Sequence, residues 1–165
     1  MIRHAGLVAL RLGGVWRGAL IEGPSGVGKS DLALRCLEAG FRLVADDRTV
    51  IWLSGGRLWG RAPDALAGLV EARGHGVLAE QAAPFAEIVL AAACVADPGQ
   101  IERLPAPAVE SILGATIARI ALAPREASAP AKLRRALQHL GAAPQQAYQA
   151  ASRGGGGRGA AGDSR

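Results

Sequence analysis

The sequence predicts an α/β fold in which a central β-sheet is flanked by helices. Two short apolar segments, residues 7–12 and 16–21, are typical of strands, and the glycine pair between them predicts a hairpin. A glycine-rich segment follows, and residues 30–40 then show the spacing of a helix that ends at Gly40. Strand, loop and helix in this order are typical of α/β layer folds.

The composition favours one domain with a single core. The chain has 165 residues, half of them apolar, and only 4% aromatic residues, so we expect a core of Leu, Val, Ile and Ala. We expect this domain to occupy residues 1–150. Residues 151–165 are rich in glycine and arginine and predict a disordered tail.

Charge and cysteine usage exclude several classes of protein. The formal net charge is +5, but the arginines are scattered, so we do not expect a nucleic-acid partner. The N-terminal segment is too short and too interrupted for a signal peptide or a membrane span. Cys36 and Cys94 lie in apolar surroundings and are predicted to be reduced core residues. We therefore expect a soluble protein of the cytoplasm with no membrane partner.

Further apolar segments predict the rest of the sheet and a last helix. Residues 41–45 form a short strand-like run that ends at two aspartates. The remaining predicted elements are a hairpin of 49–53 and 57–62, a turn or short helix at 63–70, a glycine-spaced loop at 71–78, strands at 86–96 and 116–122, and a helix at 130–141.

The segment GPSGVGKS, residues 23–30, predicts a phosphate-binding loop (P-loop). It matches G-x-x-x-x-G-K-[ST] at every fixed position, after a predicted strand and before a predicted helix. Glycines let backbone N–H groups turn toward a phosphate, Lys29 would reach the β- and γ-phosphates, and the Ser30 hydroxyl would coordinate Mg²⁺. The residues predicted to bind the nucleotide are Gly23, Pro24, Ser25, Gly26, Val27, Gly28, Lys29 and Ser30.

Two adjacent carboxylates, Asp46 and Asp47, follow the next predicted strand. A nucleotide site needs a carboxylate near the metal, and proton transfer needs another, so one aspartate could serve each purpose. The alternative is an aspartate pair that only begins a turn before the next strand.

Taken together, four segments resemble the catalytic domain of bacterial HPr kinase/phosphorylase, in the short form that lacks the N-terminal domain. The resemblance extends over roughly residues 1–140 and is specific because the segments occur in this order. It implies a P-loop kinase domain with an HPr kinase C-terminal domain-like, PEP carboxykinase-like fold. The segments are RHAGLV with His4, GPSGVGKSDLAL, LVADDR and EARGHGVL.

The resemblance also implies a role for each matching residue. His4 and Lys29 match catalytic-site residues, and Asp47 matches the aspartate that accepts the serine proton and returns it in the reverse reaction. Asp46 would support Asp47 or the metal, and Arg73 lies in the loop that contacts substrate and phosphate. The Mg²⁺ ligands would be Ser30 and Glu71.

The implied activity is a serine kinase that uses ATP and Mg²⁺ to phosphorylate the phosphocarrier protein HPr in the regulation of the phosphotransferase system. Many members also remove the phosphate with inorganic phosphate, and full-length relatives are homo-oligomers. Arg125 and Arg134 are both candidates for the family's remaining active-site arginine, with a solvated face of the last helix as the alternative. His75 departs from the family pattern and is interpreted as a tolerated surface residue.

Two other functions remain open. A phosphate loop cannot distinguish a protein hydroxyl from that of a sugar or nucleotide, so a P-loop kinase of a small metabolite is one alternative. A nucleotide-binding sensor without phosphoryl transfer is the other.

Overall fold

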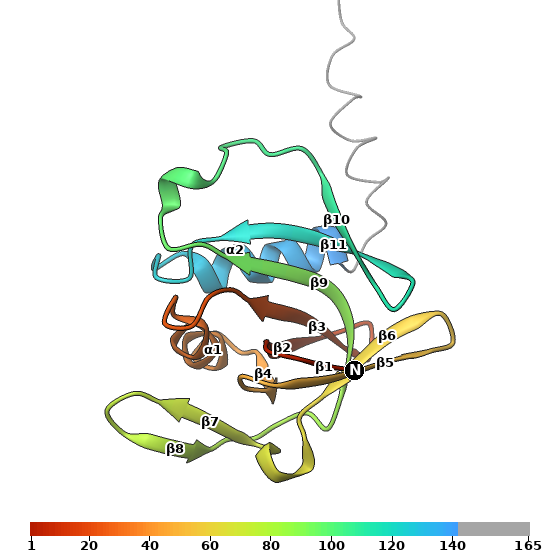
Figure 1. The fold of residues 1–165 in the computed structure, drawn as a ribbon, viewed down its shortest axis with the longest axis vertical. Helices are drawn as coiled ribbons and strands as arrows, with labels where there is room; N and C mark the ends of the chain where they lie inside the picture. Colours follow the sequence, from red (N-terminus) through yellow and green to blue (C-terminus); the bar gives the residue numbers. More distant parts are fainter. Residues whose placement is uncertain (142–165) are drawn as a thin grey trace, which may run out of the picture.

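The structure, a computed structural model of the chain, describes residues 1–141. They form a mixed α/β fold with a curled sheet and few helices (Figure 1), as the sequence predicts. The predicted domain end at residue 150 and the predicted tail at 151–165 lie outside the described residues.

Nine strands of the described chain form one sheet, and its longest path has the order β1-β5-β6-β9-β3-β2-β4. Strands β10 and β11 join this path through β9, and β7 and β8 form a separate two-stranded sheet. The strands are β1 (Ile2–Arg3), β2 (Gly6–Leu12), β3 (Val15–Glu22), β4 (Arg42–Ala45), β5 (Thr49–Ser54), β6 (Arg57–Arg61), β7 (Leu69–Ala72), β8 (Gly76–Ala79), β9 (Ala86–Cys94), β10 (Ala108–Ile112) and β11 (Ala115–Leu122).

Strand β9 is the point at which the sheet divides. One edge of β9 pairs with β3 in parallel over most of its length. The other edge pairs with β6 near Ala86 and Glu87 and with β11 from Leu90 to Cys94. Because one edge serves two strands that leave in different directions, the sheet separates into two arms beyond β9 (Figure 1).

A bulge in β9 changes which face of the sheet its side chains occupy. Gly18 of β3 pairs with Ile88, but the next residue pairs with Leu90, so Val89 is an extra residue. Before the bulge, Ala86 and Ile88 pack in one hydrophobic cluster, and after it Leu90 packs in the other. Strand β9 therefore contributes to cores on both sides of the sheet.

Two α-helices of the described chain, α1 (Lys29–Glu38) and α2 (Ala129–Ala136), cover the same face of the sheet. The buried side of α1 consists of Leu32, Ala33 and Cys36, which pack in one cluster with Leu133 of α2. This packing fixes the N-terminus of α1 at the ends of β3 and β4, where the glycine-rich loop lies.

On the opposite face, Leu7 of β2 fills a space left open by two glycines. A Cβ atom at Gly18 would lie 2.7 Å from Leu7 Cδ1, and one at Gly60 would lie 2.7 Å from Leu7 Cδ2. Leu7 itself is fully buried. These two glycines are therefore required by close packing in the interior of the sheet.

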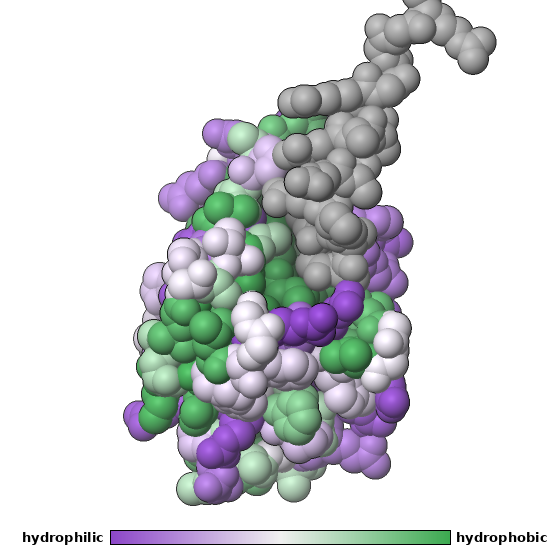
Figure 2. Space-filling view, turned by 90° about the vertical axis from the view of Figure 1, so that its right-hand side faces the viewer, coloured by the Kyte–Doolittle hydropathy of each residue, from purple (hydrophilic) through white to green (hydrophobic). Residues whose placement is uncertain are grey.

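The surface seen in Figure 2 is a mixture of polar and apolar patches. Exposed large apolar side chains such as Leu53, Val77 and Leu113 belong to different hairpins. No helix within residues 1–141 has the length and apolar character needed to cross a membrane.

Most predicted elements are confirmed, including both glycine hairpins and the core strand β9. Residues 71–78, predicted as a loop, belong largely to the hairpin of β7 and β8, so that expectation is wrong. Strands β1 and β10 were not predicted. The predicted last helix is present as α2 followed by a π-helix over Leu137–Gly141.

Candidate functional site

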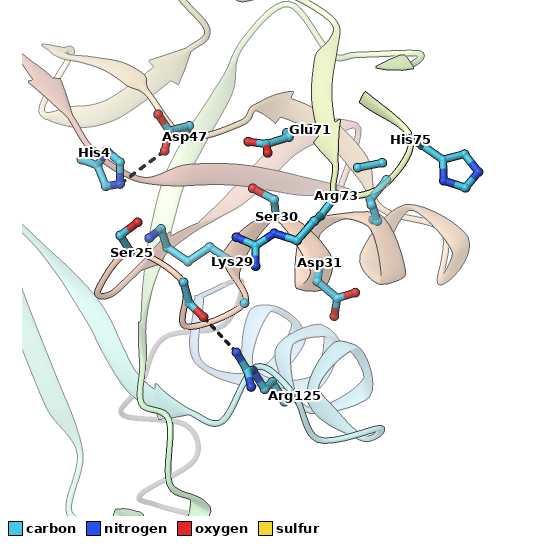
Figure 3. Close-up of a pocket in the computed structure, with 14 residues that line it drawn as sticks. His4, Ser25, Lys29, Ser30, Asp31, Asp47, Glu71, Arg73, His75 and Arg125 are labelled. Atoms are coloured by element: carbon cyan, nitrogen blue, oxygen red, sulfur yellow. Dashed lines mark hydrogen bonds and ion pairs between the residues drawn. The ribbon is translucent and has the colours of Figure 1, made fainter. Parts of the chain in front are cut away.

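A cavity of about 600 Å³ opens between the glycine-rich loop, the start of β2, the end of β4 and the β7–β8 hairpin (Figure 3). Most of the predicted site residues line this cavity, although they come from widely separated positions in the sequence. These are His4, Ser25, Gly26, Gly28, Lys29, Ser30, Asp47, Glu71 and Arg73. The other predicted residues, Gly23, Pro24, Val27 and Asp46, are not among the lining residues.

The glycine-rich loop needs its glycines for conformation and for space. Gly26 has φ 77° and Gly28 has φ 112°, in the left-handed region that favours glycine. A Cβ atom at Gly23 would lie 2.9 Å from both Cβ and the carbonyl oxygen of Cys94. The loop therefore lies directly against the end of β9, and Val27 is buried in the core beneath it.

Helix α1 begins immediately after Gly28, which is its N-cap residue and forms no side-chain cap. Ser30 lies within the first turn, so its side chain does not cap the helix. The first N–H groups of a helix have no intrahelical partners, so they attract an anion next to the loop.

Lys29 spans the mouth of the loop. Its Nζ donates hydrogen bonds to the carbonyl oxygens of Gly23 at 2.8 Å and Pro24 at 3.1 Å. In Figure 3 its side chain runs along the loop toward the side of the cavity on which His4 and Asp47 lie. The ammonium group therefore contributes positive charge on that side of the loop.

His4 and Asp47 face one another at one side of the cavity. His4 Nε2 lies 3.3 Å from Asp47 Oδ1, and the two side chains are 56% and 52% exposed, so both are accessible to solvent and to a bound molecule. Asp47 has φ 61°, a conformation that aspartate adopts more readily than most residues. This backbone turn separates the carboxylate of Asp47 from that of its neighbour.

Asp46 points inward and ties two segments of the site together. It is 9% exposed, accepts a hydrogen bond from Ser30 Oγ at 3.0 Å, and accepts another from the backbone N–H of Glu71 at 2.9 Å. Because Ser30 donates its hydroxyl hydrogen to Asp46, the lone pairs of Ser30 Oγ remain available to a cation. The two adjacent aspartates therefore occupy different environments.

The β7–β8 hairpin brings Glu71, Arg73 and His75 to the cavity. In Figure 3 Glu71 lies above Ser30, and Arg73 extends toward Lys29 and Asp31. His75 is on the rim of the cavity and points away from it in the same view, in keeping with its interpretation as a surface residue. The hairpin thus adds one acid and one base to the cavity.

The structure separates the two candidate arginines of the C-terminal segment. Arg125 lines the cavity and donates a hydrogen bond to the Gly26 carbonyl oxygen at 2.9 Å. Arg134 lies outside the cavity, where it donates to the Ala39 carbonyl oxygen and stacks 5.3 Å from the centre of the Phe41 ring. Arg134 is therefore excluded as a cavity residue.

Three lining residues, Asp31, Leu34 and Ala72, were not predicted. Asp31 and Leu34 follow Ser30 on the first turns of α1, and their spacing of three residues places them on one side of the helix. The spacing was therefore the available signal, although the same pattern is common on ordinary helix surfaces.

A network of ion pairs supports β1, which leads to His4, and β3, which leads to the glycine-rich loop. Arg3, which precedes His4, contacts Glu22 at 2.9 Å and Glu110 at 2.7 Å, and Arg119 contacts Glu110 at 2.6 Å. Burial raises the pKa of Glu22 above its ordinary value, although Arg3 acts in the opposite direction. Burial also opposes ionisation of Glu110, but hydrogen bonds from Arg3 and Arg119 lower its pKa.

The two cysteines are free and buried, as predicted. Burial raises the pKa of Cys36 to about 12 and that of Cys94 to about 11. Thiols with such pKa values are protonated near neutral pH and are poor nucleophiles and poor metal ligands. Among residues 1–141 no three His, Cys, Asp or Glu side chains are grouped so as to hold a metal ion without further ligands.

Comparisons with known proteins agree with this geometry. Residues 3–89 match the family model described as HPr Serine kinase C-terminal domain. The chain is 47% identical over 62 residues to HPr kinase/phosphorylase of Streptococcus thermophilus, 46% over 61 residues to that of Clostridium beijerinckii, and 48% over 62 residues to that of Brevibacillus brevis. Each alignment covers 37% of this chain but only 20% of the relative.

A solved structure, the Hpr(Ser) kinase/phosphatase from Coxiella burnetii, has the same fold. The TM-score is 0.71, the sequence identity is 22%, and the match covers 84% of this chain and 94% of the other. The family model covers more than half of the chain, from the strand that precedes His4 to the middle of β9. The chain therefore belongs to the HPr serine kinase C-terminal domain family.

Proposed function

We propose that this chain is a kinase that transfers the γ-phosphoryl group of ATP to a serine hydroxyl of an HPr-type phosphocarrier protein. The main supporting observation is that the His4–Asp47 pair and the Lys29 loop line the same cavity. The relatives with 46–48% identity are named HPr kinase/phosphorylase, although the alignments cover a fifth of their length.

The polyphosphate of ATP would lie on the loop from Gly23 to Ser30. Lys29, the free N–H groups at the start of α1 and Arg73 would together neutralise its negative charge. Positive charge held in place before the reaction stabilises a phosphoryl-transfer transition state, because charge spreads over the equatorial oxygens of the transferred group.

Asp47 is the proposed proton acceptor. The serine Oγ attacks the γ-phosphorus, the bond from phosphorus to the β–γ bridging oxygen breaks with its electron pair on ADP, and the serine proton moves to an Asp47 carboxylate oxygen. His4, 3.3 Å from that carboxylate, is proposed to orient it and to stabilise its charge. Asp46 is proposed to support the site by holding Ser30 and Glu71.

Ser30 and Glu71 are the residues proposed to hold Mg²⁺. The fit is supported by the Ser30–Asp46 hydrogen bond, which directs the serine hydrogen away from the cavity, and by the carboxylate of Glu71 above Ser30. With few protein ligands, the ion would take phosphate oxygens and water as its remaining ligands, as is usual for Mg²⁺. Bound Mg²⁺ would supply charge neutralisation at the β- and γ-phosphates.

The same cavity could also support the reverse reaction with inorganic phosphate. A phosphate oxygen would attack the phosphorus of phosphoserine, the serine oxygen would leave with the proton held by Asp47, and pyrophosphate would form. This step uses the anion site and the proton carrier already described, so it requires no further residue.

Purified protein, labelled ATP, Mg²⁺ and HPr test the proposal directly. The label should appear on a serine of HPr, and Asp47→Asn should reduce transfer by about 10²-fold or more while leaving ATP affinity unchanged. Asp64→Asn is a matched control, because Asp64 is an exposed aspartate paired with Arg61 outside the cavity.

Two outcomes would favour the alternatives. Label on a small hydroxyl compound but not on HPr would favour a metabolite kinase. ATP binding without transfer to any acceptor, unchanged by Asp47→Asn, would favour a nucleotide sensor.

A further inference from the structure

The segment between β11 and α2 crosses the outer side of the glycine-rich loop. Arg125 NH2 donates to the Gly26 carbonyl oxygen at 2.9 Å. A Cβ atom at Gly28 would lie 3.5 Å from Arg125 Cγ and 3.7 Å from Pro124 Cγ, which is ordinary van der Waals contact. The segment therefore lies directly against the loop, 99 residues away in sequence from the carbonyl group that it contacts.

Arg35 of α1 fixes this crossing segment from the other side. Its NH1 donates to the Glu126 carbonyl oxygen at 3.1 Å, and its NH2 donates to the Pro124 carbonyl oxygen. Its Nε lies 2.9 Å from Asp31 Oδ2, one turn earlier on the same helix. A single guanidinium group thus holds the carbonyl groups on both sides of Arg125.

We propose that Arg125 contacts the bound nucleotide and that Arg35 is the positioning residue that keeps it over the loop. This inference rests on the proposed function, because it requires that the loop binds ATP. Arg125 uses one of its five N–H donors on Gly26, which leaves the others for a ligand. Its side chain is exposed and lines the cavity on the opposite side of the loop from His4 and Asp47 in Figure 3.

The position of Arg125 indicates which part of the nucleotide it contacts. The transferred phosphate must lie near Asp47, so the rest of the molecule extends away from that side. Arg125 therefore faces the part of the nucleotide that is not transferred. It should contribute to ATP affinity more than to the rate of transfer, because that contact is the same before and during the reaction.

Arg35 does not line the cavity, so it reaches a bound nucleotide only through its partners, which are the segment that it holds and the lining residue Asp31. Its planar group matches three acceptors at once, which a lysine ammonium cannot do with the same geometry. Without these bonds, the chain around Arg125 has more conformations in the free protein. Ordering this segment when the nucleotide binds then costs free energy, which lowers the affinity for nucleotide.

Calorimetric titration with ATP and Mg²⁺ tests both roles. Arg125→Ala should weaken ATP binding about tenfold, the usual effect of a lost charged hydrogen bond, and Arg35→Ala should weaken it about threefold or more. Arg35→Lys retains the charge and the pairing with Asp31 but should still weaken binding. In kinase assays the KM for ATP should rise in each variant while kcat changes little.

A double-mutant cycle separates positioning from a general structural effect. If Arg35 acts through Arg125, then Arg35→Ala should have almost no further effect on ATP affinity in the Arg125→Ala protein. Arg134→Ala is the matched control, because Arg134 also donates to a backbone carbonyl group near the end of α1 but lies outside the cavity. It should leave ATP affinity unchanged even if it lowers thermal stability.

The two proposals fail in different ways. If the unmodified protein does not bind ATP, the proposed function is wrong. If it binds ATP but Arg125→Ala or Arg35→Lys binds equally well, or if the two alanine substitutions are additive, the roles inferred for Arg125 and Arg35 are wrong.

Discussion

Replacing each of the two adjacent aspartates by alanine should have opposite consequences for stability and activity. Asp46 is buried and accepts hydrogen bonds from Ser30 Oγ and from the N–H of Glu71. Asp47 is half exposed, and its ion-pair partners within residues 1–141 are His4 at 3.3 Å and Arg48 at 4.0 Å, both of which also reach solvent. Asp46→Ala therefore removes a buried carboxylate that holds two segments together, whereas Asp47→Ala removes a solvated carboxylate.

The expected magnitudes follow from these contacts. A hydrogen bond to a charged group contributes about 1.5–3 kcal/mol, so Asp46→Ala, which removes two, should lower the free energy of unfolding by about 3 kcal/mol. Asp47→Ala should change it by less than about 1 kcal/mol, because exposed ion pairs contribute little. Phosphoryl transfer should be nearly abolished in Asp47→Ala, while the Asp46→Ala protein, where folded, should retain part of its activity.

Urea unfolding followed by circular dichroism measures the two free energies, and the labelled-ATP assay measures transfer. Asp64→Ala provides the baseline for an exposed aspartate. The reasoning is refuted if Asp47→Ala destabilises the protein as much as Asp46→Ala, or if Asp46→Ala is as stable as the unmodified protein.

Three further predictions concern the fold. Gly60→Ala should destabilise the protein by about 1–3 kcal/mol in urea unfolding, because its methyl group would overlap Leu7; an unchanged midpoint would contradict this packing. Cys36 and Cys94, with pKa values of about 12 and 11, should not react with a thiol reagent at pH 8 until the protein is unfolded; rapid labelling of the native protein would show that they are accessible. The pKa of Glu110 is lowered in the folded protein, so ionised Glu110 stabilises the fold. This contribution is complete above the ordinary pKa of 4.5 and is lost as the pH falls through the lowered value. Glu110→Gln should therefore be less stable than the parent protein at pH 7 and equally stable in strong acid.

The sequence predicted those parts of the fold that short-range patterns determine. The hairpins at Gly13-Gly14 and Gly55-Gly56 have turn residues between alternating apolar segments, and the loop from Gly23 to Ser30 has its own motif. The hairpin of β7 and β8 was missed because its strands have only four residues each and the glycines near its turn resemble a loop. One of its anchors is a contact with Asp46, which no local pattern reveals.

The candidate site was predictable where a residue belongs to a motif and unpredictable where it depends on a distant contact. His4 and Asp47 were named from their motifs, and the structure brings their side chains together. Arg125 could not be separated from Arg134 in the sequence, since both are arginines in a basic C-terminal segment. Arg35 resembled an ordinary helix-surface residue paired with Asp31, because its carbonyl partners are about 90 residues further along the chain.

The extra residue in β9 has a consequence for changes in chain length. Deleting Val89 would remove the bulge and make Ile88 and Leu90 adjacent residues that point to opposite faces, as they already do, so each would keep its own core. An insertion at Gly13-Gly14 or Gly55-Gly56 would only lengthen an exposed connection. Insertions should therefore be tolerated at those turns, and the bulge is a place in the central strand where the loss of one residue leaves both cores intact.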